Sequence, residues 1–339
     1  MQAFGGFDGV RGMLNVLREV SLDEIREQAE TPPRILIVGP TAEAARRLGL
    51  ALTGAEGQFS SIYRGANEAL DGLGRLDAAV VWDPERSGAG SRVSTAVQYD
   101  SPPVPIVRFE GSNPDDERAI EQLRLDILRR NGERVTGFGR ALPAFRQAAA
   151  KHVIDETSMA NAQFSIVSNL PALIPIIGGL AAAGADFIVL TKNQVIMLYK
   201  LAAIYGRDLN EQRTILQEVL PVVGAGLVWR TLAREASAVL PFAAGAVPKL
   251  AIAYAGTIAV GRAADYYYRT GLKPSRAQMN EFTAMAMERM RSLNLPDLLS
   301  RFRREGDESD GNATGAPHIT VIDAEPRPEE KKRWRIGPG

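Results

Sequence analysis

The chain of 339 residues has no cysteine and only two histidines, His152 and His318. Without cysteine it can form neither disulfides nor thiolate metal sites. The two histidines lie far apart in the sequence and outside any H-E-x-x-H spacing, which disfavours a histidine-based metal site. Lysine plus arginine and aspartate plus glutamate each number 40, so no net charge favours nucleic acid. We therefore expect no metal, no cofactor and no nucleic-acid partner.

The chain also lacks the short motifs that mark common enzyme classes. It contains neither the G-x-S-x-G turn of serine hydrolases nor the G-x-G-x-x-G turn of dinucleotide-binding oxidoreductases. The N-terminus has no basic run followed by an apolar core and a small-residue cleavage site, so we expect no secretory signal. These absences favour a protein that is made in the cytosol and is not an enzyme.

Two long segments near the centre of the chain carry almost no charge. Residues Phe164–Ala185 form a run of twenty-two residues without an ionisable side chain, and Ala236–Gly261 is interrupted by a charge only at Lys249. Segments this apolar belong either in a bilayer or inside a helical bundle. Two prolines and two adjacent glycines in the middle of the first run predict two arms, each too short to span a membrane. We expect a re-entrant or interfacial hairpin over Phe164–Leu190.

The first third of the chain predicts a small α/β domain. Arg34–Gly39 is typical of a buried parallel strand, a helix is expected over Ala42–Leu52, and strand-like runs recur at Ala78–Trp82 and Val104–Phe109. Asn113 is the expected N-cap of the helix that follows. Strands that alternate with helices indicate a three-layer sheet of GTPase-like or Rossmann-like type.

The first expected strand ends at Gly39, where a P-loop would begin. A working P-loop needs G-x-x-x-x-G-K-[ST], in which the lysine supplies charge to the phosphates and the hydroxyl binds magnesium. The matching positions hold Ala44, Ala45 and Arg46, and Glu43 adds negative charge where an anion would dock. We therefore expect a degenerate GTPase-like domain that binds no nucleotide. Its vestigial phosphate loop consists of Gly39, Thr41, Ala44, Ala45 and Arg46.

Two alternatives stay open for this domain. An unrelated small α/β domain fits the same residues, and a divergent nucleotide-binding regulator could use backbone contacts around Gly39. The Asn-Lys-x-Asp motif does not follow Phe109, so no residues at that position would recognise guanine specifically. Asp83, after the second expected strand, could serve as a magnesium carboxylate. An aspartate at the end of a strand and next to a proline, as Asp83 is next to Pro84, is more often an ordinary turn residue than a magnesium ligand.

From Ala141 to about Arg291 the long segments are typical of helices. The recurring motifs include Ala141-Leu142-Pro143-Ala144-Phe145-Arg146, Asn161-Ala162-Gln163-Phe164, Gly184-Ala185-Asp186, Thr191-Lys192-Asn193-Gln194, Tyr205-Gly206 and Thr257…Gly261. This pattern resembles the domain-of-unknown-function family 697, a helical module found behind GTPase domains in bacterial proteins, over about residues 140–270. The resemblance implies membrane association, a link to GTPases and a degenerate GTPase fold for the first domain. It supplies no catalytic residues.

Polar side chains inside the apolar segments form a candidate buried polar set, because burial without a partner is costly. Asp186 paired with a lysine or arginine from another helix is the compensated pair that we expect. Satisfaction by a neighbour or a helix cap is the commoner case, and a transport or signalling role is the alternative. The set consists of Asn169, Asp186, Thr191, Gln194, Arg230, Arg234, Glu235 and Lys249.

These patterns divide the chain into N-terminal amphipathic helices (1–30), a degenerate P-loop GTPase-like α/β domain (31–138), an apolar helical domain with hairpins (139–300) and a flexible charged tail (301–339). The tail ends on a basic patch around Trp334 that can contact anionic lipid. We expect a membrane-associated protein that faces the cytoplasm and acts as a scaffold or regulatory interaction module. Its expected partners are membrane lipid, other proteins and itself. The alternatives are a divergent nucleotide-binding regulator and a soluble helical adaptor.

Overall fold

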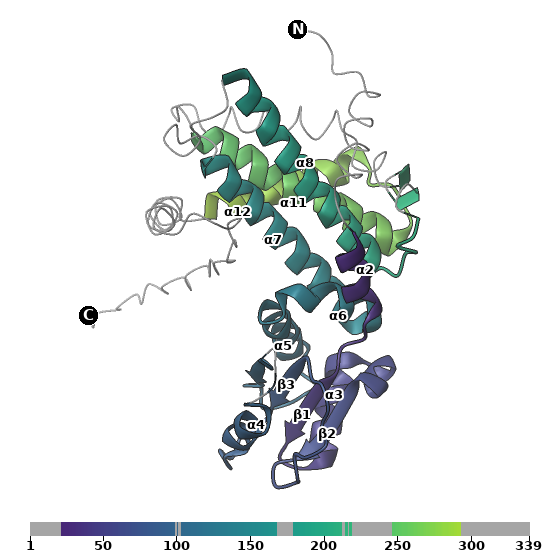
Figure 1. The fold of residues 1–339 in the computed structure, drawn as a ribbon, viewed down its shortest axis with the longest axis vertical. Helices are drawn as coiled ribbons and strands as arrows, with labels where there is room; N and C mark the ends of the chain where they lie inside the picture. Colours follow the sequence, from purple (N-terminus) through teal and green to yellow (C-terminus); the bar gives the residue numbers. More distant parts are fainter. Residues whose placement is uncertain are drawn as a thin grey trace, which may run out of the picture.

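A computed structural model describes residues 22–98, 103–167, 179–211 and 246–292, together with positions 100, 214, 215, 217 and 218. For residues 166, 167, 179–188, 246–249, 251 and 252 it describes the backbone only. The described residues form two parts along the long axis of the molecule, with a parallel sheet and its helices at one end and long helices at the other (Figure 1).

The described sheet has four parallel strands in the order β2-β1-β3-β4, namely β1 (Ile35–Gly39), β2 (Ser61–Gly65), β3 (Ala78–Val81) and β4 (Ile106–Arg108). In register, Ile37 lies between Tyr63 of β2 and Val80 of β3. The three strands expected from the sequence are confirmed, with ends that differ by one or two residues. The edge strand β2 was not expected, because its polar and half-buried residues lack the continuous apolar run of a central strand.

Alternate residues of the strands face opposite layers of helix, as the period of a β-strand requires. Ile35, Ile37 and Val80 pack against α3 (Ala42–Thr53) and α5 (Glu117–Arg129). Leu36 and Val38 pack on the other face against α4 (Ala89–Val97). The mixed α/β class and the three-layer sheet are therefore confirmed.

The start of α5 differs from the expectation. The N-cap is Asp116, whose side chain accepts hydrogen bonds from the N–H groups of Arg118 and Ala119. Asn113 instead caps the turn before the helix, where its Oδ1 accepts from the N–H of Asp115 at 3.0 Å. Pro114 lies in that turn and not in the helix, because Asp116 stands directly before the first helical residue.

A short helix, α6 (Val135–Ala141), follows a 3₁₀ turn, η2 (Gly132–Arg134), and spans the domain boundary expected at residue 138. Beyond it lie α7 (Arg146–Val167), α8 (Gly179–Ile204), α11 (Ala246–Thr270) and α12 (Arg276–Ser292), while α2 (Asp23–Glu30) precedes the sheet.

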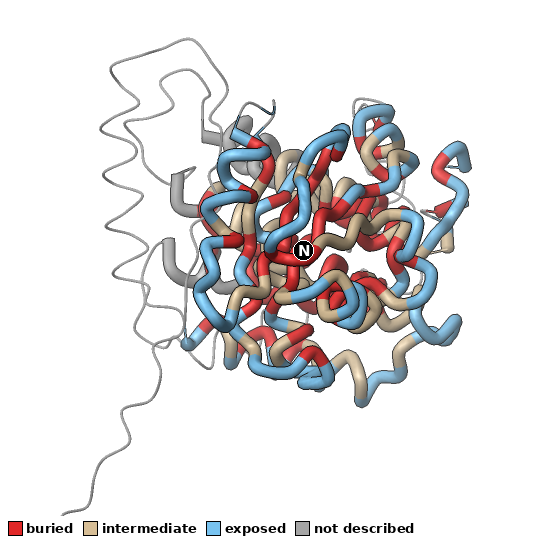
Figure 2. The backbone as a smooth tube through the Cα atoms, turned by 90° about the horizontal axis from the view of Figure 1, so that it is seen from below, coloured by how far each residue is buried: buried red, intermediate tan, exposed pale blue. Residues whose placement is uncertain are grey.

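One continuous hydrophobic cluster runs from Ile37 of the sheet through Phe138 of α6 to Met287 of α12. Seen from the sheet end, buried positions lie in the interior and exposed ones around it (Figure 2).

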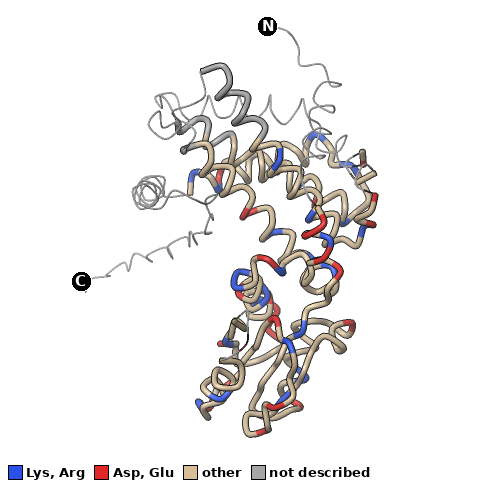
Figure 3. Tube along the Cα trace, in the orientation of Figure 1, with Lys and Arg blue, Asp and Glu red and all other residues tan. Residues whose placement is uncertain are grey.

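The expectation of an apolar bundle with hairpins is not supported. Among the described helices, none combines the length and the apolarity that crossing a bilayer requires, and so none supports a transmembrane helix. Charged residues such as Lys151, Lys200, Arg262 and Asp265 interrupt α7, α8 and α11, although much of each helix is uncharged (Figure 3). The centre of the expected hairpin, residues 168–178, lies outside the described residues.

Candidate functional site

The turn between β1 and α3 occupies the place of the expected phosphate loop. The strand ends at Gly39 and the helix begins at Ala42, so Pro40 and Thr41 alone join them. Thr41 is the N-cap, and its Oγ1 accepts a hydrogen bond from the N–H of Ala44 at 3.1 Å. The N–H of Ala45 is bonded to the carbonyl of Thr41 at 2.9 Å. The cap thus satisfies the N–H of Ala44, one of the groups at the start of a helix that have no partner within it.

The side chains of this turn do not converge on a ligand. Ala45, at the position of the P-loop lysine, is fully buried in the core, and Arg46, at the position of the hydroxyl, is exposed. A Cβ added to Gly39 would lie 2.7 Å from the backbone nitrogen of Ala45. Gly39 therefore packs against the start of the helix, which leaves no loop around a phosphate.

A carboxylate lies beside the same helix end. The Oε2 atom of Glu68 accepts a hydrogen bond from the N–H of Gly65, at the end of β2, at 3.0 Å. A Cβ added to Gly65 would lie 3.2 Å from the nitrogen of Ala42 and 3.4 Å from Oε1 of Glu68. The negative charge that favours a helix N-terminus is thus supplied by the chain, and it repels a phosphate.

Asp83 is an ordinary turn residue. It accepts hydrogen bonds from the N–H and hydroxyl of Ser87 at 2.7 and 2.9 Å, and from the N–H groups of Gly88 and Ala89 at 3.1 Å each. Desolvation raises the pKa of Asp83, but these hydrogen bonds, led by that of Ser87 N–H, outweigh it and lower the pKa. Within the described residues, no three histidine, aspartate or glutamate side chains gather into a metal site.

The structure describes only part of the candidate buried polar set. Asn169, Arg230, Arg234 and Glu235 lie outside the described residues, and for Asp186 and Lys249 the backbone alone is described, within α8 and α11. Thr191 is half-buried on α8. Gln194, also on α8, is the member that the fold brings to other polar groups.

Gln194 belongs to a polar cluster where α7, α8 and α11 meet. Asn161 and Thr257 are fully buried, and Asn161 Nδ2 donates to Thr257 Oγ1 at 2.9 Å. Asn193 Nδ2 donates to Asn161 Oδ1 at 2.8 Å, and Gln194 Nε2 donates to Thr257 Oγ1 at 3.4 Å. The hydroxyl of Thr257 in turn donates to the carbonyl of Ala253 at 2.7 Å. The motifs that carry the family resemblance contain these polar residues, but among them only Gln194 was predicted from the sequence as a member of the buried polar set.

Two further polar contacts of the helices were not expected from the sequence. Asp155 of α7 and Arg289 of α12 form a bidentate ion pair, with both N···O distances 2.7 Å. Desolvation lowers the pKa of Arg289, but the charge of Asp155 outweighs it and raises the pKa. Tyr205 donates to Oδ1 of Asp265 at 2.6 Å, and burial together with that carboxylate raises the pKa of Tyr205. Spacing in the sequence gives no signal for pairs this distant.

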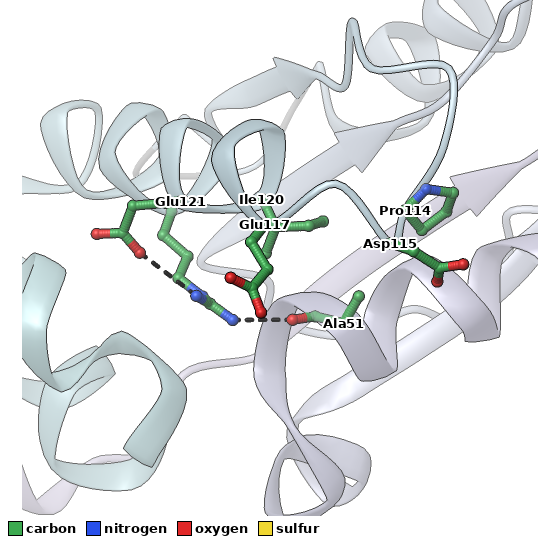
Figure 4. A pocket seen from close by; sticks show the side chains of 7 residues that line it. Ala51, Pro114, Asp115, Glu117, Ile120 and Glu121 are labelled. Atoms are coloured by element: carbon green, nitrogen blue, oxygen red, sulfur yellow. Dashed lines mark hydrogen bonds and ion pairs between the residues drawn. The ribbon is translucent and has the colours of Figure 1, made fainter.

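A surface hollow of about 500 Å³ lies between α3 and α5 (Figure 4). Arg124 crosses it, donating to the carbonyl of Ala51 at 2.8 Å and to Glu121 at 3.3 Å. Asp115 at its rim is paired with Arg47, and Glu117 and Ile120 also line it. The guanidinium of Arg124 is thus bonded to the C-terminal end of α3, where its Nε also donates to the carbonyl of Leu52 at 2.9 Å.

Protein-family models, curated proteins and solved structures compared with this chain give no match. The resemblance to the domain-of-unknown-function family 697 therefore stays a prediction.

Proposed function

We propose that this protein is a non-enzymatic scaffold or regulatory interaction module whose degenerate GTPase-like domain takes no nucleotide. The observation that carries the proposal is the two-residue turn from β1 to α3. Thr41 caps the helix there, Ala45 is buried in the core, and Glu68 supplies the negative charge. A phosphate would have to displace these groups and would meet no lysine.

The strand order supports the same reading. In open α/β sheets, ligands bind at the carboxyl ends of the strands where the strand order reverses, which in this sheet is between β1 and β3. Thr41 and Asp83 each stand two positions after the end of one of those strands. Each of them is committed to capping the next helix of the chain, so the usual ligand position of the fold is filled by local structure.

Isothermal titration of the full chain with GTP, GDP and ATP in the presence of magnesium tests this part of the proposal. We expect no saturable heat of binding. Gly39 is a poor position for a control, because a Cβ there would clash with Ala45 whether or not nucleotide binds. Arg46→Ala is a better control, since that side chain is exposed. Saturable binding that Arg46→Ala weakens would establish the divergent nucleotide-binding regulator instead.

Membrane association is the second part of the proposal. Its support is the charge-poor Phe164–Ala185 segment and the family resemblance. Helices that meet through small and polar residues, as α7 and α11 do around Gly261 and Thr257, are common in lipid.

Separation of cells into soluble and membrane fractions, followed by an alkaline carbonate wash, tests that association. Retention after the wash is expected if the central hairpin enters hydrocarbon, and release by the wash is expected for surface docking through the basic tail. Recovery in the soluble fraction from the outset would replace the membrane proposal with a soluble helical adaptor.

A further inference from the structure

The short helix α2 touches both parts of the molecule. Leu22, Ile25 and Ala29 on its buried face belong to a hydrophobic cluster with Tyr199 and Ala203 of α8. At its other end, α2 leads into β1 through Thr31, two prolines and Arg34. In Figure 1 α2 lies beside α6, between the long helices and the sheet. The helix therefore links α8 to the sheet.

One guanidinium holds the end of α2 on the α/β domain. Arg134 Nη1 donates to the carbonyl of Gln28 at 3.3 Å, and Nη2 donates to the carbonyl of Thr31 at 2.9 Å. Its Nε donates to Oδ1 of Asp77, directly before β3, at 3.0 Å. Asp77 also accepts from the N–H of Arg34 at 2.8 Å. The side chains of Arg134 and Asp77 are 16% and 6% exposed, so little water competes with these contacts.

The backbone of α6 also approaches α2 closely. A Cβ added to Gly137 would lie 2.6 Å from the carbonyl oxygen of Gln28 and 3.2 Å from that of Thr31. At the far end of α6, Arg140 Nη1 donates to the carbonyls of Ala203 and Arg207, at the end of α8, at 3.2 and 2.9 Å. The arginines at the two ends of α6 thus bind the C-terminal ends of two different helices.

By itself α2 is a weak helix, although Asp23 and Glu24 in its first turn suit the helix dipole. It has eight residues, its N-cap Leu22 makes no side-chain cap, and its last turn has no basic residue. Helices this short are marginal in water. Glu27 and Glu30 stand near its C-terminus, where the helix dipole disfavours negative charge. The helix therefore depends on its buried face and on contacts with other segments, from Arg134 and from Arg26, whose Nη1 donates to Asn210 Oδ1 at 3.1 Å.

We propose that α2 is a releasable latch, which opens as a unit while the sheet and the long helices stay folded, and which removes one of the links between α8 and the α/β domain when it opens. Elements that have few buried contacts, and whose terminal hydrogen bonds come from side chains of other elements, open at a lower free energy than the core. Opening exposes the apolar face of α2 and the cluster around Tyr199. The latch does not depend on whether the domain binds nucleotide.

The absence of cysteine allows a direct test in the full chain. Ala29→Cys places a thiol on the buried face of α2, and Ala45→Cys places one in the core of the α/β domain; the two alanines are 3% and 0% exposed. Each variant is labelled with a thiol reagent under native conditions. We expect Ala29→Cys to be labelled faster than Ala45→Cys by a factor of ten or more, roughly 1.4 kcal/mol or more of easier opening.

Arg134→Gln in each background then tests the role of the guanidinium. It should speed labelling of Ala29→Cys by about tenfold, because charged hydrogen bonds are lost, and speed that of Ala45→Cys much less, since Asp77 keeps its bonds to Arg34 N–H and Arg75. Arg140→Gln, at the other end of α6, is the matched control, and its effect on Ala29→Cys should be smaller. Equal labelling of the two thiols in the unaltered background overturns the latch. That comparison stands even if Arg134→Gln does not fold.

Discussion

Asn161 and Thr257 are 96 positions apart in the sequence, yet the amide of one donates to the hydroxyl of the other at 2.9 Å. Both side chains are fully buried. Thr257 also accepts from Gln194 and donates to its own helix. The packing of α7 against α11 is therefore specified by a polar contact as well as by apolar surface, since a buried polar group without its partner is costly.

Thr257→Val keeps the shape of that side chain and removes its hydroxyl. The amide of Asn161 then loses a buried partner, and we expect a loss of about 1–3 kcal/mol in the free energy of unfolding. Urea denaturation measures it. Thr270→Val is the matched control, because Thr270 lies on the same helix, is exposed and bonds only its own turn. A Thr257→Val loss no larger than the control would show that the cluster adds nothing.

Gly261 allows α7 and α11 to approach closely. A Cβ added there would lie 2.6 Å from Cγ1 of Ile154, so we expect Gly261→Ala to cost about 1–3 kcal/mol through overpacking. The double variant with Ile154→Ala should lose less than the sum of the two single variants. Gly132→Ala is the control, since nothing lies within 4 Å of a Cβ at that position. Strict additivity of the two losses would argue against the clash.

The Asp155–Arg289 ion pair ties α12 to α7. Arg289→Met should lower the unfolding free energy by about 1 kcal/mol, a modest value because the two side chains are 27% and 39% exposed. Adding Asp155→Asn to Arg289→Met should restore part of that loss by removing the unpaired carboxylate. Thermal unfolding of the four proteins in the cycle measures the coupling, and no restoration would mean that the pair contributes nothing.

His152 should make the protein less stable in acid. Burial lowers its pKa below the ordinary 6.5, an effect that the charges of Glu156 and Asp155 oppose and those of Lys200 and Arg129 support. The unfolded chain then binds the proton more readily than the folded one. The contribution of the neutral His152 to the free energy of unfolding is therefore fully present above pH 6.5, and it is lost as the pH drops through and below that value.

Urea midpoints from neutral pH down to about pH 5 measure that slope, with the unperturbed histidine pKa inside the window. His152→Gln cannot take up the proton, so its stability should fall less steeply over the range. Parallel curves for the two proteins would show that His152 does not contribute.

The sequence predicted the β1, β3 and β4 strands, because buried parallel strands are short continuous apolar runs. It missed β2, whose residues Ser61–Gly65 are half-buried at the sheet edge and carry polar side chains. It placed the N-cap of α5 at Asn113 instead of Asp116, since several good capping residues stand in a row. The choice among them depends on where the preceding strand ends.

What the sequence alone determined is local: the parallel strands, the lack of P-loop chemistry after Gly39, and the absence of thiol and histidine clusters. Such features follow from the residue types at neighbouring positions. The tertiary structure decided that the carboxylate of Glu68 lies beside the N-terminus of α3, which Thr41 caps. It also decided that Asn161 donates to Thr257 and that Arg134 donates to the C-terminal end of α2. These contacts join residues from separate helices and strands, and which faces meet is fixed only when the whole core packs.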